Sequence, residues 1–595
     1  MCGLFGELKF NQSSHAYQAL DGHLKDLYSR GPDSQGVWIN PPICFGHTRL
    51  KIMDLGDESQ QPMIDPNLGL AMVFNGAIYN YKELRSDLVK LGYRFFSDGD
   101  TEVILKAYHA WGEKCVEQFN GMFAFAIWDT HKRRLFVARD RLGIKPLYFY
   151  QDNEQIVFSS FMPALIRHLN KPVSIDPFGL HSYFSFHAIV PAPHTLFKEI
   201  KKLEPGHTLT LSENGKTEKR CYWQLNFPQE GNQLEDDVWI HKIKDKLHQS
   251  IKRRLIADVP VGIFLSGGVD SSLLVAMANE HTSHQLKTFS IGFNTVGDEE
   301  GDEFKYSDIV AKKYQTDHKK FVIGDNDVLK HLPNCIRSMS EPQVSHDAIG
   351  FYLLSQFASK EMKVVLSGQG ADEVFAGYHW HQKLAQSVNA AHDYANAFID
   401  YPFEVYKTIV NSPYIKDDFS RQFIEKQFAK PGAYSPLQKV LRSDTTIMLV
   451  DDPVKRVDNM TMAHSLEARV PFLDHELIEA AAQIPSSIKL KSDGKFILKE
   501  IARQYVPSEV IDRKKGYFPV PGLKYISGAY MHYARELISS AKQKNRGILN
   551  WSYVDDLLQK DPKDILTPLN GSKLWQVVLL ETWLSEQGIE LNESQ

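Results

Sequence analysis

The sequence predicts a multidomain α/β protein, because two different patterns of strands and helices follow one another along the chain. Residues 1–200 contain short apolar strands bounded by Gly, Asp and Pro, with two apolar helical patterns among them, which predicts sheets covered by helices. From residue 236, strands alternate with longer helices, as in a doubly wound parallel sheet, and helical patterns dominate from about residue 380. A chain of 595 residues also requires at least two domains.

The elements of the first part are short and clearly bounded. The strand patterns are GLFGELKF, LAMVFNGAIYNY, FAFAIWD, RRLFVARD and PLYFY. The helical patterns are YKELRSDLVKLGY and EVILKAYHAWGEKCVEQF. Residues 201–235 contain an EPGH turn, an SENGK hairpin signal and a polar stretch, so we interpret them as a connector. We therefore expect one domain at 1–200 and a second at 236–595.

The second part alternates strands with helices in three successive pairs. These are VGIFLS before SSLLVAMANE, KTFSIGF before FKYSDIVAKKY, and KVVLSG before ADEVFAGY. Alternation of this kind is typical of a parallel sheet with helices on both faces.

Composition excludes several classes of protein. A net charge of −5 gives no basic footprint for nucleic acid or an anionic membrane, and we interpret the basic clusters at 131–134 and 513–515 as solvated faces. The five cysteines are scattered and form no CxxC pair, so neither a disulfide framework nor a zinc site is indicated. No stretch resembles a signal peptide or a membrane span, and we expect a cytoplasmic protein.

A glycine-rich loop follows the first strand of the second part. In VPVGIFLSGGVDSSLLVAMAN (259–279) the strand ends at Leu265 and an apolar helix follows the loop at once. Glycines let the backbone approach an anion closely, and exposed amides at a helix start favour negative charge. The loop is neither a Walker loop nor a dinucleotide fingerprint. It predicts a phosphate site, the alternative being a strand-to-helix turn with no ligand.

The loop sequence SGGVDSS resembles the pyrophosphate loop of ATP pyrophosphatases, which cleave ATP between the α and β phosphates. The resemblance implies that the adenine and ribose contact residues outside the loop as well. The implied ATP-binding residues are Leu265, Ser266, Gly267, Gly268, Asp270, Ser271, Ser272, Ile291, Ser367 and Gly368.

Two carboxylates are candidate Mg²⁺ ligands. Asp270 lies in the loop, and Asp372 lies in LSGQGADEVFAGY (366–378), which repeats the order of strand, glycine-rich turn and acidic residue. Pyrophosphate release needs a hard cation with carboxylate support. The alternative is that both are solvated turn acids.

Cys2 directly follows the initiator methionine. Removal of that methionine would leave a thiol and a free α-amine on one residue, so that one residue could supply both nucleophile and base. The alternative is an early residue of a buried strand.

Seven stretches in the first part decide between these readings of Cys2. They are Cys2-Gly3, SRGPDSQG (29–36), GHTRLKIMD (46–54), FNGAIYNY (74–81), DGDTEVILKAY (98–108), NGMFAFAIWD (120–129) and ARDRLGIKPLYF (138–149). In this order they resemble the class II glutamine amidotransferase domain, which implies the N-terminal-nucleophile fold, a four-layer αββα sandwich.

That resemblance assigns roles around the glutamine substrate. Cys2 attacks the side-chain amide, and Asn75 with Gly76 forms the oxyanion hole. Arg49 binds the α-carboxylate and Asp100 the α-ammonium, the alternative being a structural salt bridge between the two. The backbone of Leu50, Lys51, Ile52 and Met53 lines the same site. Asparagine synthetases commonly have NGEIYN, but this chain has Ala77 in place of the glutamate.

The two parts joined in this order resemble the asparagine synthetase family. Later motifs agree: SEPQVSHDA (340–348), DNMTMAHSLEARVPFLDHEL (458–477) and KSDGKFILKE (491–500). The resemblance implies that Glu341 is a base near the acceptor and that Lys495 stabilises charge during adenylation. Either residue could instead be an ordinary surface residue. We interpret LEARVPFLD as a packing segment that joins the domains, and Phe472, Tyr183 and Phe184 as core residues.

Several further stretches resemble the branch of the family that amidates N-acetylglutaminylglutamine. They include FHAIVPAPHTLF, DRKKGYFPVPGLKY and LTPLNGSKLWQVVLLETWL. We therefore expect a glutamine-hydrolysing ligase that uses ATP and Mg²⁺ to adenylate this acceptor, and an apolar channel for ammonia. Aspartate as acceptor is the enzymatic alternative, and a glutamine or ATP sensor is the non-enzymatic one. A β-lactam-forming relative is disfavoured, because it would need no ammonia source.

The expected partners are glutamine and the carboxylate acceptor, with no nucleic acid or membrane, and a homodimer is a possible assembly.

Overall fold

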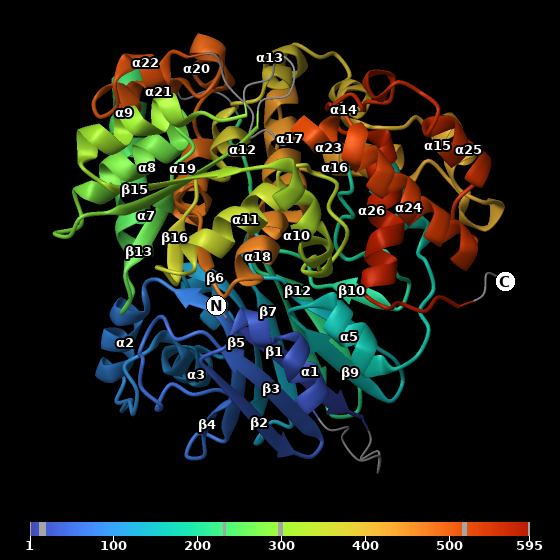
Figure 1. Cartoon of the computed structure of the whole chain (residues 1–595). Helices are drawn as coiled ribbons and strands as arrows, with labels where there is room; N and C mark the ends of the chain where they lie inside the picture. The colour runs from blue at the N-terminus through green and yellow to red at the C-terminus, as the bar shows by residue number, and fades with distance from the viewer. Residues whose placement is uncertain (1, 11–19, 230–233, 295–300, 514–520, 593–595) are drawn as a thin grey trace.

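Two antiparallel sheets stack face to face in the N-terminal half of the computed structural model, which describes all residues except 1, 11–19, 230–233, 295–300, 514–520 and 593–595 (Figure 1). The first sheet contains, in spatial order, β10 (Ile200–Lys202), β8 (Tyr148–Gln151), β9 (Gln155–Ser159), β1 (Gly3–Lys9), β3 (Ile43–Arg49) and β2 (Ser34–Asn40). The second contains β12 (Thr217–Cys221), β11 (His207–Ser212), β7 (Arg134–Arg139), β6 (Gly121–Asp129), β5 (Leu70–Ile78) and β4 (Met63–Asp65). Apolar side chains of both sheets, such as Leu4, Phe45, Val73 and Trp128, form one buried cluster between them.

Helices cover the outer faces of these sheets. The helices of this half are α1 (Asp21–Asp26), α2 (Tyr81–Lys90), α3 (Asp100–Trp111), α4 (Cys115–Gln118), α5 (Met162–Leu169) and α6 (Pro177–Ser185). α3 packs on β5 of the second sheet, and α5 packs on β8 and β9 of the first. The predicted αββα sandwich is therefore confirmed. The second predicted helical pattern is divided, because Gly112 ends α3 with a left-handed φ of 63°.

The expected connector at 201–235 is too long. β11 pairs with β7 and then with β12 through the hairpin that the SENGK signal predicts, so residues up to Cys221 belong to the second sheet. The physical reason is that β7 would otherwise present an edge with unpaired backbone groups, which the hairpin satisfies. The connection between the halves begins only after β12.

A parallel sheet forms the core of the second half. Its strands, in spatial order, are β15 (Asp317–Ile323), β14 (Lys287–Phe293), β13 (Val261–Phe264), β16 (Val364–Leu366) and β17 (Glu467–Arg469). The helices around it are α7 (Asp236–Arg254), α8 (Val269–Asn279), α9 (Phe304–Tyr314), α10 (Asp325–Arg337), α11 (Ala348–Ala358) and α12 (Ala371–Phe375). The chain order reverses at β13, which pairs with β14 on one side and β16 on the other. Such a switch point opens a crevice at the carboxyl ends of the strands.

The rest of the second half is helical, as expected, and appears from yellow to red in Figure 1. Two π-helical turns over residues 444–454 lead directly into α18. The helices are α13 (His379–Ala385), α14 (Ala390–Phe398), α15 (Phe403–Ile409), α16 (Phe419–Ala429), α17 (Pro436–Ser443), α18 (Lys455–Met462), α19 (His475–Ala482), α20 (Ser486–Lys489), α21 (Phe496–Arg503), α22 (Ser508–Ile511), α23 (Pro521–Lys524), α24 (Gly528–Lys544), α25 (Trp551–Leu557) and α26 (Lys573–Glu586). Among the described residues, no helix is both long and apolar enough to cross a bilayer.

The two halves share their apolar cores. One buried cluster joins Leu50 and Met122 of the first half to Leu273 and Phe472 of the second. Another cluster joins residues of the first sheet and its helices to the C-terminal helix α26. Phe472, Tyr183 and Phe184 are fully buried, which confirms that they are core residues.

Candidate active sites

The first candidate site surrounds Cys2 at the start of β1. Cys2 is 8% exposed, and its main-chain nitrogen donates a hydrogen bond to Oδ1 of Asn75 at 3.0 Å. Asn75 lies on β5, in the other sheet, so the bond crosses the sandwich. In the part of the chain that the structure describes, the Nδ2 of Asn75 is buried and has no hydrogen-bond partner. A buried donor without a partner is rare and costly, and here it lies beside the predicted nucleophile.

Gly76 follows Asn75 on β5 and allows a close approach between strands. A Cβ atom at this position would lie 2.1 Å from the carbonyl oxygen of Met122 on β6. Only glycine therefore fits at this position, which lines the same pocket as Cys2. This placement is consistent with the predicted oxyanion hole, in which Asn75 Nδ2 and the Gly76 main-chain N–H donate to the same oxygen.

Arg49 and Asp100 both line this pocket, but the structure records no ion pair between them. The guanidinium of Arg49 donates to the carbonyl oxygens of Gly56, at 2.8 Å, and of Asp54. Asp100 accepts a hydrogen bond from the main chain of Ile78 at 2.8 Å, and burial raises the pKa of Asp100 to about 6. The two opposite charges thus remain separate within one pocket, as a ligand with both an ammonium and a carboxylate group requires.

The loop between Arg49 and Asp54 lines the pocket only in part. Leu50, Ile52 and Met53 are lining residues. Lys51 is not one of them, and its ammonium forms an ion pair with Asp57 at 3.0 Å. Ala77 lines the pocket at the position where the family commonly has glutamate.

The environment of the Cys2 thiol does not favour the thiolate. Burial raises the pKa of this thiol above its ordinary value, and the Leu50 main chain and Arg49 offset the rise only in part. A thiol in such surroundings needs a base beside it in order to react. The α-amine of Cys2 itself is the base that the sequence predicts, and Met1 lies outside the described residues.

Two residues of the second half line this pocket, and the sequence analysis missed them. Glu467 and Arg469 lie on β17, in the segment that we interpreted only as a packing element. Their side chains form an ion pair at 2.6 Å, and both are almost fully buried. Their motif gave no local signal of this role, because only the tertiary contact between the halves brings β17 to Cys2.

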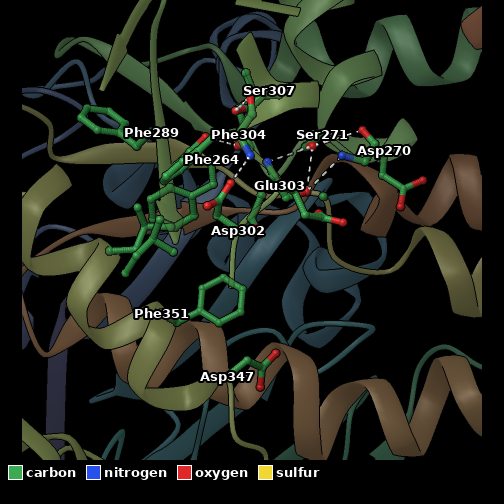
Figure 2. Close-up of a pocket in the computed structure, with 18 of the residues that line it drawn as sticks. Phe264, Asp270, Ser271, Phe289, Asp302, Glu303, Phe304, Ser307, Asp347 and Phe351 are labelled. Carbon is green, nitrogen blue, oxygen red and sulfur yellow. Dashed lines mark hydrogen bonds between the residues drawn. The ribbon is translucent and has the colours of Figure 1, made fainter. Parts of the chain in front are cut away.

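The second candidate site lies at the carboxyl ends of β13, β14 and β16 and encloses a cavity of about 190 Å³ (Figure 2). Most of the residues predicted to bind ATP line it: Leu265, Ser266, Gly268, Asp270, Ser271, Ile291, Ser367 and Gly368. Gly267 and Ser272 do not. Gly267 forms the turn of the loop with a left-handed φ of 76°, and Ser272 is fully buried in the first turn of α8.

The lining of this cavity also contains aromatic and acidic residues. Figure 2 shows Phe289 at one side of the view and Asp270 at the other, with Asp302 and Glu303 between them. The other aromatic lining residues are Phe264, Phe293, Phe304 and Phe351. A flat aromatic base fits against the aromatic side chains, and phosphates with a cation fit beside the carboxylates. The sequence analysis missed these aromatic residues. They lie in strands and helices, where an apolar residue is first interpreted as part of the core.

Lys495 joins the two predicted metal ligands. Its ammonium lies 2.7 Å from Asp270 and 2.8 Å from Asp372, although these residues are far apart in the chain. Burial lowers the pKa of Lys495, but the two carboxylates raise it by more, so the lysine stays charged. Two carboxylates that converge on one cation are suitable ligands for Mg²⁺ when phosphate oxygens complete the shell. The donor set therefore fits the predicted metal.

Glu341 lies outside the lining of both pockets, in a buried cluster of charges. Its Oε2 atom accepts from Lys455 at 2.7 Å and from Lys202 at 3.0 Å, and both lysines also contact Asp451. Within the described ranges, the Oε1 atom of Glu341 is buried and has no hydrogen-bond partner. Glu341 is therefore buried, and the alternative that it is an ordinary surface residue is wrong. Its role as a base stays a prediction.

Arg513 lies beside the phosphate loop, which contradicts our interpretation of the 513–515 cluster as a solvated face. Its guanidinium forms an ion pair with Glu303 at 2.6 Å and stacks over the ring of Tyr306. One of its nitrogen atoms lies 3.9 Å from where a Cβ of Gly268 would be. Lys514 and Lys515 lie outside the described residues.

The two pockets are connected through the parallel sheet. The main-chain nitrogen of Ser367, which lines the second pocket, donates to the carbonyl oxygen of Arg469, which lines the first, at 2.8 Å. Helix α18 connects the surroundings of Cys2 to the charge cluster around Glu341. Its Asp458 pairs with Arg30, which also donates to the carbonyl oxygen of Cys2, while its Lys455 pairs with Glu341.

Comparison with known proteins gives matches to both halves of the chain. A glutamine amidotransferase domain model matches residues 1–223, and an asparagine synthase model matches residues 242–585. Among curated proteins, "Asparagine synthetase [glutamine-hydrolyzing] 1" of Bacillus subtilis is 33% identical over 98% of this chain and 96% of its own length. "Asparagine synthetase [glutamine-hydrolyzing] 3" of the same organism is 28% identical over 100% of both chains. "Amidase chry2" of Gibberella zeae is 24% identical over 91% of this chain and 90% of its own.

Proposed function

The chain belongs to the asparagine synthetase family and is a glutamine-dependent carbon–nitrogen ligase, and we propose that it forms the C-terminal amide of N-acetylglutaminylglutamine. In this proposal glutamine supplies ammonia at Cys2, and ATP activates the acceptor carboxylate in the second pocket. The products are glutamate, the amide, AMP and pyrophosphate. A homodimer stays a prediction.

The first pocket supplies the groups that glutamine hydrolysis needs. The Cys2 sulfur attacks the side-chain amide carbon, and Asn75 Nδ2 with the Gly76 N–H stabilises the negative oxygen that develops. The α-amine of Cys2 takes the thiol proton and passes it to the leaving nitrogen, so the C–N bond breaks and ammonia leaves. Water then hydrolyses the glutamyl thioester to glutamate and restores the thiol. Arg49 and Asp100 hold the α-carboxylate and the α-ammonium, which fixes the amide against the sulfur.

The second pocket supplies the groups that carboxylate activation needs. An acceptor carboxylate oxygen attacks the α-phosphorus of ATP, and the bond to the leaving pyrophosphate breaks. Asp270 and Asp372 would hold Mg²⁺, which neutralises phosphate charge when bound. Lys495 lies against both carboxylates and adds a fixed positive charge at the same place. Ammonia then attacks the acyl carbon and AMP leaves.

The observation that supports transfer of ammonia between the two sites is the main-chain hydrogen bond between Ser367 and Arg469. It joins a residue that lines the nucleotide pocket to one that lines the glutamine pocket, so both pockets adjoin the same parallel sheet. Buried ion pairs also cross between the halves, because Arg30 and Lys145 of the first half both pair with Asp458 of the second. The channel itself stays a prediction.

The identity of the acceptor is supported by the resemblance of the sequence stretches, not by the chemistry of the pockets. It is tested by incubating the protein with Mg-ATP and glutamine labelled with ¹⁵N in its amide. The acceptor is either N-acetylglutaminylglutamine or aspartate. Pyrophosphate release and ¹⁵N in the C-terminal amide of the dipeptide alone support the proposal. Label in asparagine alone would refute it, and so would no release with either acceptor.

A further inference from the structure

A large cavity lies where the two halves and the segment between them meet, and it shares no lining residue with either active-site pocket. It encloses about 880 Å³, which is within the range of small-molecule sites. Its walls come from α6, the loop at 191–194, residues 204–225, α16 and α17, and the π-helical turns that follow α17.

The charged lining of this cavity is positive and is not balanced by its own acids. Four of its residues are Arg141, Lys426, Lys430 and Arg442, against the two carboxylates Glu204 and Asp451. Glu204 is paired with Lys219, and Asp451 is paired with Lys202 and Lys455. Both acids are therefore already neutralised by lysines that do not line the cavity.

The two arginines are buried without a carboxylate partner among the described residues. Arg442 is 9% exposed and donates only to main-chain carbonyl oxygens, those of Pro431, Gln427 and Lys430. Arg141 is 8% exposed; two of its nitrogens donate to carbonyl oxygens, and its buried Nε has no partner in the described chain. Burial lowers the pKa of Arg442, and no neighbouring acid contributes to the shift. Buried cations are normally paired with an anion, so these two guanidinium groups favour an anionic ligand beside them.

The lining also contains a group of aromatic side chains. The ring of Phe178 stacks on His194 with centroids 4.1 Å apart and lies 5.6 Å from Phe419 and 6.2 Å from Phe423. Trp223 lines the cavity as well. Such faces favour a planar ring at stacking distance.

We propose that this cavity is a second ligand site, which binds an organic anion that combines a planar ring with a phosphate or carboxylate group. The guanidinium groups bind the anionic group, because their donors match the oxygens of carboxylate and phosphate. The aromatic residues bind the ring. Because the walls belong to both halves, the bound ligand stabilises their association and raises the temperature of unfolding.

The test is calorimetric titration of the full chain with the nucleotide pocket already filled by Mg²⁺ and a non-hydrolysable ATP analogue. The probes are GMP, phenylpyruvate, neutral guanosine and inorganic phosphate. We expect GMP or phenylpyruvate to bind with one site per chain, and to bind more tightly than guanosine and inorganic phosphate. Binding of GMP alone identifies phosphate as the anionic group, and binding of phenylpyruvate alone identifies carboxylate.

The matched variants are Lys426→Glu, in the cavity, and Lys439→Glu, on α17 outside the lining. Lys426 is exposed and has no recorded ion pair among the described residues, so its replacement should not affect folding. We expect Lys426→Glu to weaken binding roughly tenfold or more, and Lys439→Glu to leave it unchanged. Equal binding by the wild type and Lys426→Glu would overturn the proposal. So would equal binding of GMP and guanosine, or no binding of GMP and phenylpyruvate.

Discussion

In the glutamine pocket most of the reacting groups lie on strands, whereas in the nucleotide pocket the two carboxylates lie in the first turns of the helices that follow strands. Cys2 directly precedes β1, and Asn75 and Gly76 are part of β5, so the ladders of two sheets fix their positions. Asp270 and Asp372 lie in α8 and α12, which follow β13 and β16, and Lys495 forms an ion pair with each of them. We therefore expect the first site to be formed before its substrate arrives, and the second to change its ion pairs when phosphate and a cation bind.

The largest expected effect is a loss of activity that is confined to the glutamine pocket. Cys2→Ala removes the attacking sulfur, so glutamine-dependent amide synthesis should fall by about 10³-fold or more. Synthesis from ammonium chloride should persist, because the nucleotide pocket is intact. Pyrophosphate release with each nitrogen source measures both. If glutamine still drove synthesis, the assignment of Cys2 would be wrong.

Replacing Lys495 should give the opposite pattern. Lys495→Ala removes the charge between Asp270 and Asp372, so synthesis from either nitrogen source should fall by about 10²- to 10³-fold. Glutamine hydrolysis, followed as glutamate release, should continue.

Lys499→Ala is the matched control for Lys495→Ala, because Lys499 lies one turn further along α21 and contacts Ser492 instead. It should retain synthesis. Equal losses in the two variants would show that the effect arises from the folding of α21 and not from the site.

Asn75→Ala should affect only the first pocket, and less strongly than the loss of the sulfur. Removing one oxyanion donor typically lowers kcat about 10²-fold, and the KM for glutamine should change little. Initial rates of glutamate release give both constants. A change confined to KM would mean that Asn75 binds the substrate and does not stabilise the transition state.

The smallest expected effect is a pH dependence that only the first pocket shows. The carboxyl of Asp100 has a pKa of about 6, so it is ionised above that pH and becomes protonated below it. Because the glutamine α-ammonium needs the ionised form, the KM for glutamine should rise roughly tenfold per unit as pH falls below 6. The KM for ATP should not follow this profile. Asp100→Asn should bind glutamine weakly and remove the dependence, and a KM that ignored pH in the wild type would exclude Asp100 from ammonium binding.

Strand-borne motifs were the most predictable part of this protein. The strand at Leu70–Ile78 and the loop after Phe264 each carry their chemistry within a few neighbouring residues, so a local pattern contains the whole signal. The sequence predicted the hairpin at 207–221 but not its pairing with β7 in the second sheet. Pairing between strands that are far apart in the chain gives no local sequence pattern.

What the sequence could not predict depends on contacts between the halves. Glu467 reaches the glutamine pocket, and Arg513 reaches the phosphate loop, from segments that look like packing or surface segments in isolation. For Glu341 the sequence predicted a role but not the contacts around the side chain. Its motif suggested a base at the acceptor, but the partners that decide its chemistry are Lys202 and Lys455, which lie far from it in the chain.

The shared apolar cores have a consequence for how this protein can be divided. Sequence motifs separate the chain into two modules, yet Leu50 and Met122 pack in the same cluster as Leu273 and Phe472. A module expressed alone would expose that cluster to water, and large exposed apolar patches cause aggregation. We therefore expect that neither module can be produced as a stable protein without the other. Half-reactions are better isolated by point substitutions than by truncation.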